Sequence, residues 1–189
     1  MENNKNEEME KKITRTGFTK ACFEWVESLI PALIISVLLL TFVFRLVTVN
    51  GISMENTLFH NDKLIVRNFF YKPSNGDIVV VGPVWGLDNH IIIKRVIATE
   101  GQTLDINFDT GDITVDGNVL DEPYIKERTR LKEGGEIPKV IPKGYVFVMG
   151  DNRNHSTDSR SYKLGLVSKD MIVGKAEFIV SPLDRIRRL

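Results

Sequence analysis

The sequence predicts a mainly β protein: an antiparallel β-sandwich or barrel-like catalytic domain behind one N-terminal transmembrane helix. Two observations support this prediction. A charge-free apolar run extends from Ser28 to Phe44, and after Gly51 short β-branched segments alternate with turn signals. No long segment with a 3.6-residue apolar period follows the run, and 189 residues suffice for one domain and an anchor.

The apolar run is interpreted as a membrane anchor. As a helix, the stretch from Ser28 to Phe44 spans about 25 Å, slightly less than the roughly 30 Å of a bilayer core. Continuing the helix through Arg45 to Val49 supplies the missing length, with Arg45 reaching the headgroups. We therefore expect an N-terminal segment over 1–27, a transmembrane helix over 28–49 and a β domain over 50–189.

Charges before the run set the expected orientation. Basic residues precede the run at Lys11, Lys12, Arg15 and Lys20, which places the N-terminus in the cytoplasm and residues 50–189 outside it. The alternative is a cleavable signal peptide, but the run is long for one and no Ala-x-Ala site follows it. The expected location is the cell membrane, with a single pass and an extracytoplasmic catalytic domain.

Five segments of the β domain read as strands because they are rich in β-branched residues. They are Lys63–Arg67, Asp77–Val81, His90–Ala98, Tyr145–Met149 and Lys175–Val180. A hairpin is expected from Asp105–Phe108 and Asp112–Leu120, with turns at Thr110-Gly111 and Asp116-Gly117.

Composition excludes two classes of function. Lys+Arg and Asp+Glu are 25 each, so the basic stripe of a nucleic-acid-binding protein is missing. The densest basic cluster, Arg185 with Arg187 and Arg188, is interpreted as a solvated tail. The single cysteine, Cys22, precedes the apolar run, so an internal disulfide and a cysteine nucleophile in the outer domain are both excluded.

Ser53 and Lys94 are the candidate catalytic pair. A solvated lysine has a pKa of about 10.4, and desolvation can lower it by up to about 3–5 units, which yields a neutral amine able to act as a general base. Strand alternation places Lys94 on the same face as Ile92 and Val96. If that face is buried, the amine is neutral; if it lies at a strand edge, the amine reaches solvent. The residues alone leave both possibilities open.

The three histidines, His60, His90 and His155, lie in no hydrolase motif and lack metal-ligand spacing. No metal and no cofactor are expected, because an amine base needs neither.

Four blocks occur in order behind the apolar run: Gly51–Leu58, Gly76–Val81, Lys94–Ile97 and Gly150–Arg160. Asp121–Tyr124 lies between the third and the fourth. Together they resemble the type I (leader) signal peptidases, a serine–lysine peptidase family, in its Gram-positive form with a single anchor. The resemblance covers roughly residues 25 to 180.

The resemblance implies a role for each matching residue. Ser53 is the expected nucleophile and Lys94 the expected general base, and the reaction passes through an acyl-enzyme. Ser156 matches a serine that orients the lysine amine. Asp158 and Arg160 match a pair that holds this region in shape.

Two positions depart from the family pattern. Gly51 stands where some members have a serine whose hydroxyl donates to the oxyanion, so that donor is absent here or comes from elsewhere. Asn56 stands where the family usually has a proline after the nucleophile. From the loss of the stiffening ring we expect slower catalysis or relaxed geometry, but not inactivity.

The resemblance further implies exported preproteins as substrates, bound as extended strands and cut after an Ala-x-Ala-like site. Membrane lipid and the export machinery are the other expected partners; nucleic acid is not. Two alternatives remain. A self-cleaving peptidase of the SOS-repressor type is disfavoured by the apolar run, and a tethered β module that binds without catalysis is disfavoured by the intact Ser53 and Lys94.

Overall fold

The computed structural model describes residues 20, 23–37, 43–84, 87 and 90–189. The chain divides into two compact units, Met1–Phe42 and Val43–Leu189. In the first unit residues 23–37 are helical, so the helix includes five residues that we assigned to the N-terminal segment. None of the helices in the described ranges is both long and apolar enough to cross a membrane.

The expected transmembrane helix is wrong at its C-terminal end. Residues 44–48 form strand β1 (Phe44–Thr48), which pairs antiparallel with β2 (Lys63–Arg67). Val49 is buried in the core and Val47 packs against it, while Arg45 lies opposite Val66 in the ladder rather than on a helix. Core packing and pairing with β2 therefore outweigh continuation of the helix. Residues 38–42 of the expected span lie outside the described residues.

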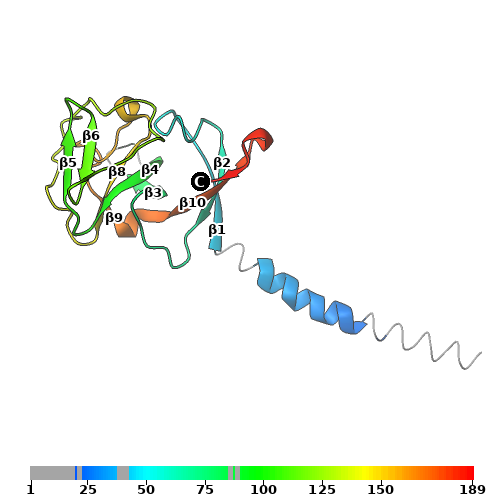
Figure 1. The fold of residues 1–189 in the computed structure, drawn as a ribbon. Coiled ribbons are helices and arrows are strands. Elements are labelled where there is room, and N and C mark those ends of the chain that lie inside the picture. The colour runs from blue at the N-terminus through cyan, green and yellow to red at the C-terminus, as the bar shows by residue number, and fades with distance from the viewer. Residues whose placement is uncertain (1–19, 21–22, 38–42, 85–86, 88–89) are drawn as a thin grey trace, which may run out of the picture. The chain divides into compact units, whose positions relative to one another are not determined.

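In the described part of the second unit, an 8-stranded sheet has the order β1-β2-β10-β3-β4-β8-β9, with β11 paired to β10, beside a 3-stranded sheet of order β5-β6-β7 (Figure 1). All the strand pairings among the described residues are antiparallel, which confirms the mainly β, antiparallel prediction. The remaining strands are β3 (Ile78–Val84), β4 (His90–Thr99), β5 (Leu104–Asn107), β6 (Asp112–Val115), β7 (Asn118–Val119), β8 (Tyr145–Met149), β9 (Val167–Ser168), β10 (Ile172–Ser181) and β11 (Arg187–Arg188). Short 3-10 helices occupy Arg153–His155, Lys169–Met171 and Leu183–Arg185.

Strand β3 is buried on both faces, which explains its unbroken apolar sequence. Ile78 and Val80 belong to one core cluster, whereas Val79 and Val81 belong to another. The first cluster also contains Met54 and Leu58, so the loop that follows β1 is anchored in the core at two points.

The predicted hairpin is present as β5, β6 and the short β7. Asp116 and Gly117 have φ values of +50° and +79°, as the two central residues of a type I′ turn require. Gly111, in the other predicted turn, has a φ of +82°. The Asp-Gly and Thr-Gly turn signals were thus interpreted correctly.

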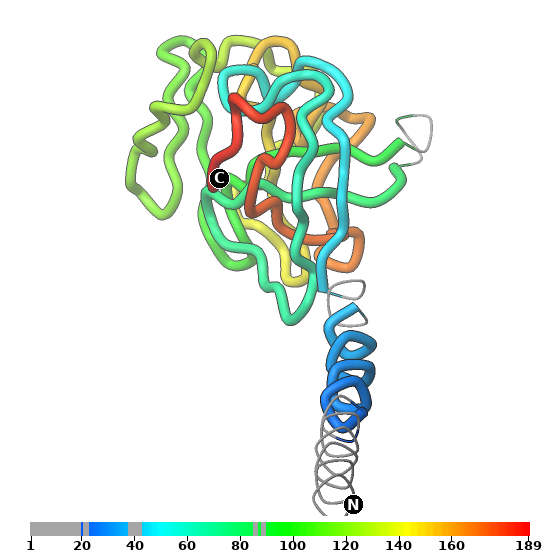
Figure 2. The backbone as a smooth tube through the Cα atoms, turned by 90° about the vertical axis from the view of Figure 1, so that its right-hand side faces the viewer, coloured from blue at the N-terminus to red at the C-terminus, as the bar shows by residue number. Residues whose placement is uncertain are grey.

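The basic tail does not extend freely into solvent. Figure 2 shows the C-terminal segment, in red, folded back over the body. Arg185 and Arg187 each donate to the carbonyl oxygen of Thr57, over 3.3 Å and 2.7 Å, and Arg185 pairs with buried Asp62. The interpretation as a solvated tail is confirmed in part, since Arg187 and Arg188 are exposed. The segment is nevertheless tied down, because carbonyl and carboxylate acceptors of the loop before β2 bind the guanidinium groups of Arg185 and Arg187.

Candidate active site

The structure brings Ser53 and Lys94 into contact although 41 positions separate them. Ser53 lies in the turn after β1, and Lys94 lies in the middle of β4. The Lys94 Nζ atom is 2.7 Å from the Ser53 Oγ atom, and it also donates to the Ile93 carbonyl oxygen over 3.2 Å. A hydroxyl and an amine at this distance can exchange a proton directly.

Lys94 is buried, with 3% of its surface exposed, which decides between the two possibilities that the sequence left open. Desolvation lowers the pKa of Lys94 to about 8, while the charges of Asp158 and Asp151 act in the opposite direction. At pH 7 roughly a tenth of this amine is therefore neutral, about two to three hundred times the fraction of a solvated lysine. The side chain is suited to accept a proton near neutral pH.

Asn152 fixes the backbone on both sides of the candidate nucleophile. Its backbone N–H donates to the Ser53 carbonyl oxygen over 3.0 Å, and its Nδ2 donates to the Ile52 carbonyl oxygen over 3.1 Å. Because Asn152 is fully buried, it is a rigid support for the Ser53 turn. Its place inside the Gly150–Arg160 block was the only sequence signal for this role.

Gly51 begins the turn with a φ of +97°, a conformation that favours glycine. Its backbone N–H donates to the Nδ1 atom of His60 over 3.2 Å. Sequence reasoning gave His60 no role, and its contact with the Ser53 turn appears only in the folded chain.

Gly150 allows Ser156 and the backbone of Ser53 to lie close together. A β carbon at this position would collide with the Ser156 hydroxyl and with the Ser53 carbonyl oxygen. Sequence analysis assigned Gly150 no function beyond its place in the matching block. The structure shows that a larger residue there would separate Ser53 from Ser156.

Ser156 is 3% exposed, and its Oγ atom has no hydrogen-bond partner among the described residues. It lies beside Gly150, on the same side as the Ser53 carbonyl oxygen. No hydrogen bond joins it to Lys94 in this conformation. An unpaired buried hydroxyl is costly, and it is available to any donor or acceptor that forms nearby during a reaction.

Asp158 and Arg160 form a fully buried two-point ion pair, with Nε–Oδ1 and Nη2–Oδ2 distances of 2.8 Å each. Asp158 also accepts from the Gly150 N–H over 3.0 Å, and Arg160 donates to the carbonyl oxygens of Arg153 and Leu131. The pair thereby ties the Gly150 backbone to the loop that precedes β8.

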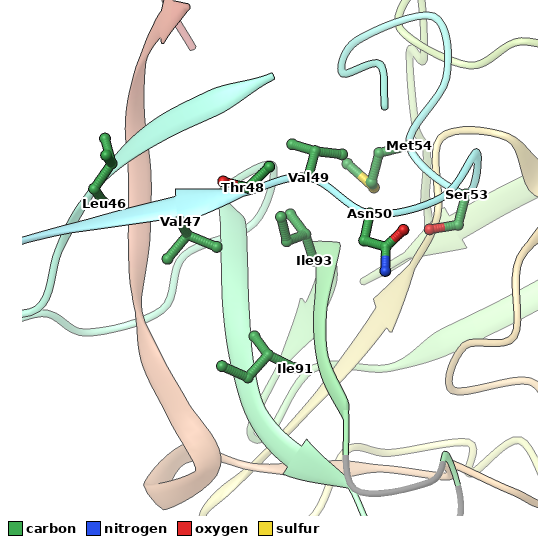
Figure 3. A pocket seen from close by; sticks show the side chains of 9 residues that line it. All are labelled: Leu46, Val47, Thr48, Val49, Asn50, Ser53, Met54, Ile91 and Ile93. Carbon is green, nitrogen blue, oxygen red and sulfur yellow. The ribbon is translucent and has the colours of Figure 1, made fainter. Parts of the chain in front are cut away.

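A pocket of about 290 Å³ opens beside Ser53. Figure 3 shows the Ser53 hydroxyl and the Asn50 carboxamide at one end and aliphatic side chains along the rest. These side chains come from β1, from the loop that follows β1 and from the first half of β4: Leu46, Val47, Val49, Met54, Ile91 and Ile93. The pocket can therefore hold a small apolar group next to the candidate nucleophile.

Comparison with known proteins assigns the class. Residues 22–181 match the family model described as signal peptidase, peptidase S26. The chain belongs to this family and is a serine peptidase of the signal peptidase I type.

The sequences of curated relatives match this sequence over most of its length. Signal peptidase I P of Bacillus subtilis subsp. natto is 36% identical over 87% of this chain and 91% of the relative. Signal peptidase I T of Bacillus subtilis (strain 168) is 32% identical over 100% of this chain and 99% of the relative. A crystal structure of a signal peptidase I from Enterococcus faecalis V583 is 27% identical, covers 56% of this chain and 97% of that chain, and gives a TM-score of 0.46.

Proposed function

We propose that this protein is a membrane-bound endopeptidase that removes N-terminal signal peptides from exported preproteins through a Ser53/Lys94 dyad. Family membership supports the removal of signal peptides. The observation that supports the dyad is the 2.7 Å contact between the Lys94 Nζ atom and the Ser53 Oγ atom inside the buried site.

In the proposed mechanism, neutral Lys94 accepts the hydroxyl proton as Ser53 Oγ attacks the scissile carbonyl carbon. The resulting ammonium then donates a proton to the leaving amine, so the peptide bond breaks and an acyl-enzyme remains. A water molecule attacks the ester, again with Lys94 as the base, and releases the cleaved signal peptide. The pKa of about 8 suits both proton transfers, since neither protonation state is strongly favoured near neutral pH.

Supporting residues stabilise charge during these steps. The Ser53 backbone N–H is the proposed oxyanion donor, because Gly51 has no hydroxyl and its own N–H is bound by His60. The Lys94 ammonium has three N–H donors, two of which are used by Ser53 and Ile93. We assign the unpaired Ser156 hydroxyl as the acceptor for the third when the amine becomes protonated.

The substrate is proposed to bind as an extended strand along β1, which is an edge strand of the large sheet. The aliphatic pocket next to Ser53 would take the small side chain before the scissile bond, as an Ala-x-Ala-like site requires.

We place the catalytic unit, Val43–Leu189, outside the cytoplasm and an anchor within the apolar run that precedes it, with residues 1–27 as the cytoplasmic segment. Lipid is then a second partner and the export machinery a third. Phe69 and Phe70 support contact with lipid, because this aromatic pair is exposed at a turn, Phe70 to 88%.

The test is cleavage of a preprotein bearing an Ala-x-Ala site by the full, detergent-solubilised chain. Ser53→Ala and Lys94→Met should each abolish cutting, whereas Lys139→Met, at an exposed lysine without an ion pair among the described residues, should not. If the unmutated chain folds and binds the preprotein without cutting it, the tethered binding module is the better assignment. Cutting that survives Lys94→Met would rule out the dyad.

A further inference from the structure

Two overlapping tight turns carry Ser53. In the first, the Glu55 N–H donates to the Ile52 carbonyl oxygen over 3.0 Å, so Ser53 lies inside it. In the second, the Thr57 N–H donates to the Met54 carbonyl oxygen over 3.1 Å, and Asn56 is the third of its four residues. Because the turns share Met54 and Glu55, a change in the path of the second turn is transmitted to the first.

Asn56 has a φ of +87°, which matches the value of about +80° that a type II turn requires at its third residue. Asparagine and glycine reach this conformation, whereas a proline ring fixes φ near about −65°. The second turn therefore cannot form as observed with proline at this position.

The Asn56 side chain adds a tether. Its Nδ2 atom donates to the carbonyl oxygens of Tyr124 and Ile125, over 3.1 Å and 3.3 Å. The same neighbouring segment is joined to the Ser53 loop by the ion pair of Lys126 with Glu55, at 2.7 Å.

The expected loosening of this loop is thus not what the structure shows. Stiffness that a ring would have supplied is replaced by two hydrogen bonds to residues 124–125, at a backbone angle that no proline adopts. The buried side chains of Met54 and Leu58 fix the flanks of the turn. A different second turn would consequently change the backbone at Met54, which both turns share, and would strain the Ser53 turn against its two hydrogen bonds from Asn152.

We infer that Asn56 is a positioning residue for Ser53, acting through its left-handed backbone and its tether to residues 124–125. This inference rests on the proposed role of Ser53 as the nucleophile. Asn56 then has a positioning role of its own in this chain and is not merely a less rigid replacement for proline.

Three variants of the full chain separate the two contributions: Asn56→Gly, Asn56→Asp and Asn56→Pro. Asn56→Gly keeps the backbone angle but loses the tether, so kcat should fall about fivefold while KM stays within about twofold. Asn56→Asp tolerates the angle but turns a carboxylate toward two carbonyl oxygens, so kcat should fall further. Asn56→Pro forces another turn, and kcat should fall about a hundredfold, as misplaced reacting groups do.

The matched control is Asn61→Gly. Asn61 also has a positive φ, +71°, and its carboxamide makes no hydrogen bond within the described part of the chain. This variant should keep the unmutated kcat. Melting temperatures measured alongside distinguish positioning from unfolding, because a purely structural role would lower Tm and activity together in all the variants, whereas positioning lowers kcat in Asn56→Gly at an unchanged Tm.

The outcomes divide clearly. Unmutated kcat in Asn56→Gly, or in a folded Asn56→Pro, overturns the inference. If Asn56→Pro does not fold, the kcat values of the other two variants decide. A kcat that falls in Asn56→Gly and falls further in Asn56→Asp supports the inference, and an unmutated kcat in both overturns it. Failure of the proposed function shows up separately, as cutting that persists in Ser53→Ala; the inference then falls with it, whatever the Asn56 variants do.

Discussion

Arg95 holds both carboxylate oxygens of Asp151, with an Nε–Oδ1 distance of 2.8 Å and an Nη2–Oδ2 distance of 2.6 Å. Arg95 follows the proposed base in β4, and Asp151 precedes Asn152, which binds the Ser53 carbonyl oxygen. The Arg95 Cζ atom also lies over the Tyr124 ring, 3.9 Å from its centre. This ion pair therefore joins the strand of the base to the support of the nucleophile.

Replacing Arg95 by methionine should lower the free energy of unfolding by about 3–5 kcal/mol, because Asp151 is left as an uncompensated buried charge. Chemical denaturation followed by tryptophan fluorescence measures this loss. Arg95→Met combined with Asp151→Leu should recover much of the stability but little of the activity. Equal losses in the single and the double variant would contradict this account of the pair.

The pH dependence of kcat/KM should follow the ionisation of Lys94. The reactive form is the neutral amine, so below pH 8 the rate should rise about tenfold per pH unit and then level off near the pKa of about 8. Steady-state rates between pH 6 and pH 10 test this prediction. A level profile down to pH 6 would exclude a lysine base with this pKa.

Lys94→Met should stabilise the fold at neutral pH while abolishing activity. Burial lowers the Lys94 pKa from 10.5 to about 8, and at about 1.4 kcal/mol per unit the buried amine costs about 3 kcal/mol below pH 8, where it is protonated in both states. As pH rises from 8 to 10.5 the cost disappears, since the unfolded chain then holds the extra proton. Denaturation at pH 7 and at pH 11 should therefore show a gain only at pH 7.

Gly150→Ala should reduce activity strongly, because its β carbon would push Ser156 away from the Ser53 carbonyl oxygen. The overpacking should also cost about 1–3 kcal/mol of stability. Gly82→Ala is a suitable control: its β carbon would come no closer than 3.2 Å to a neighbouring atom, a carbonyl oxygen beside β3. Similar kcat losses in both variants would show that crowding at Gly150 has no special relation to the site.

Local sequence patterns predicted the parts of this fold that depend on short-range chemistry. Strands Lys63–Arg67 and Tyr145–Met149 occur with the predicted bounds, and the Asp116-Gly117 turn follows from the φ values that those residues tolerate. Strand β1 was missed because residues 44–48, which carry Phe44, Leu46 and Val47 beside Arg45, suit the end of a helix in lipid as well as a strand, and only pairing with β2 distinguishes the two.

In the candidate site, too, the residues with a local sequence signal could be predicted, whereas those defined by contacts in the folded chain could not. Ser53 and Lys94 could be proposed from their neighbours in sequence and from the family resemblance. The contacts of Asn152, Gly150 and His60 could not, because each depends on how the folded chain brings that residue to the Ser53 turn. No periodicity or spacing rule encodes such contacts.

Arg185 and Arg187 should differ in their contribution to stability, even though both donate to the Thr57 carbonyl oxygen. Arg187 makes the shorter bond, 2.7 Å, but it is exposed, so Arg187→Ala should cost no more than about 1 kcal/mol. Arg185 also stacks on Phe59 and pairs with the buried carboxylate of Asp62. Its loss leaves that carboxylate with a single donor among the described residues, the Phe59 N–H, so Arg185→Ala should cost about 1–3 kcal/mol. Urea denaturation of the two variants tests the order, and a larger loss in Arg187→Ala would mean that the bond to Thr57, rather than neutralisation of Asp62, holds this segment against the Ser53 loop.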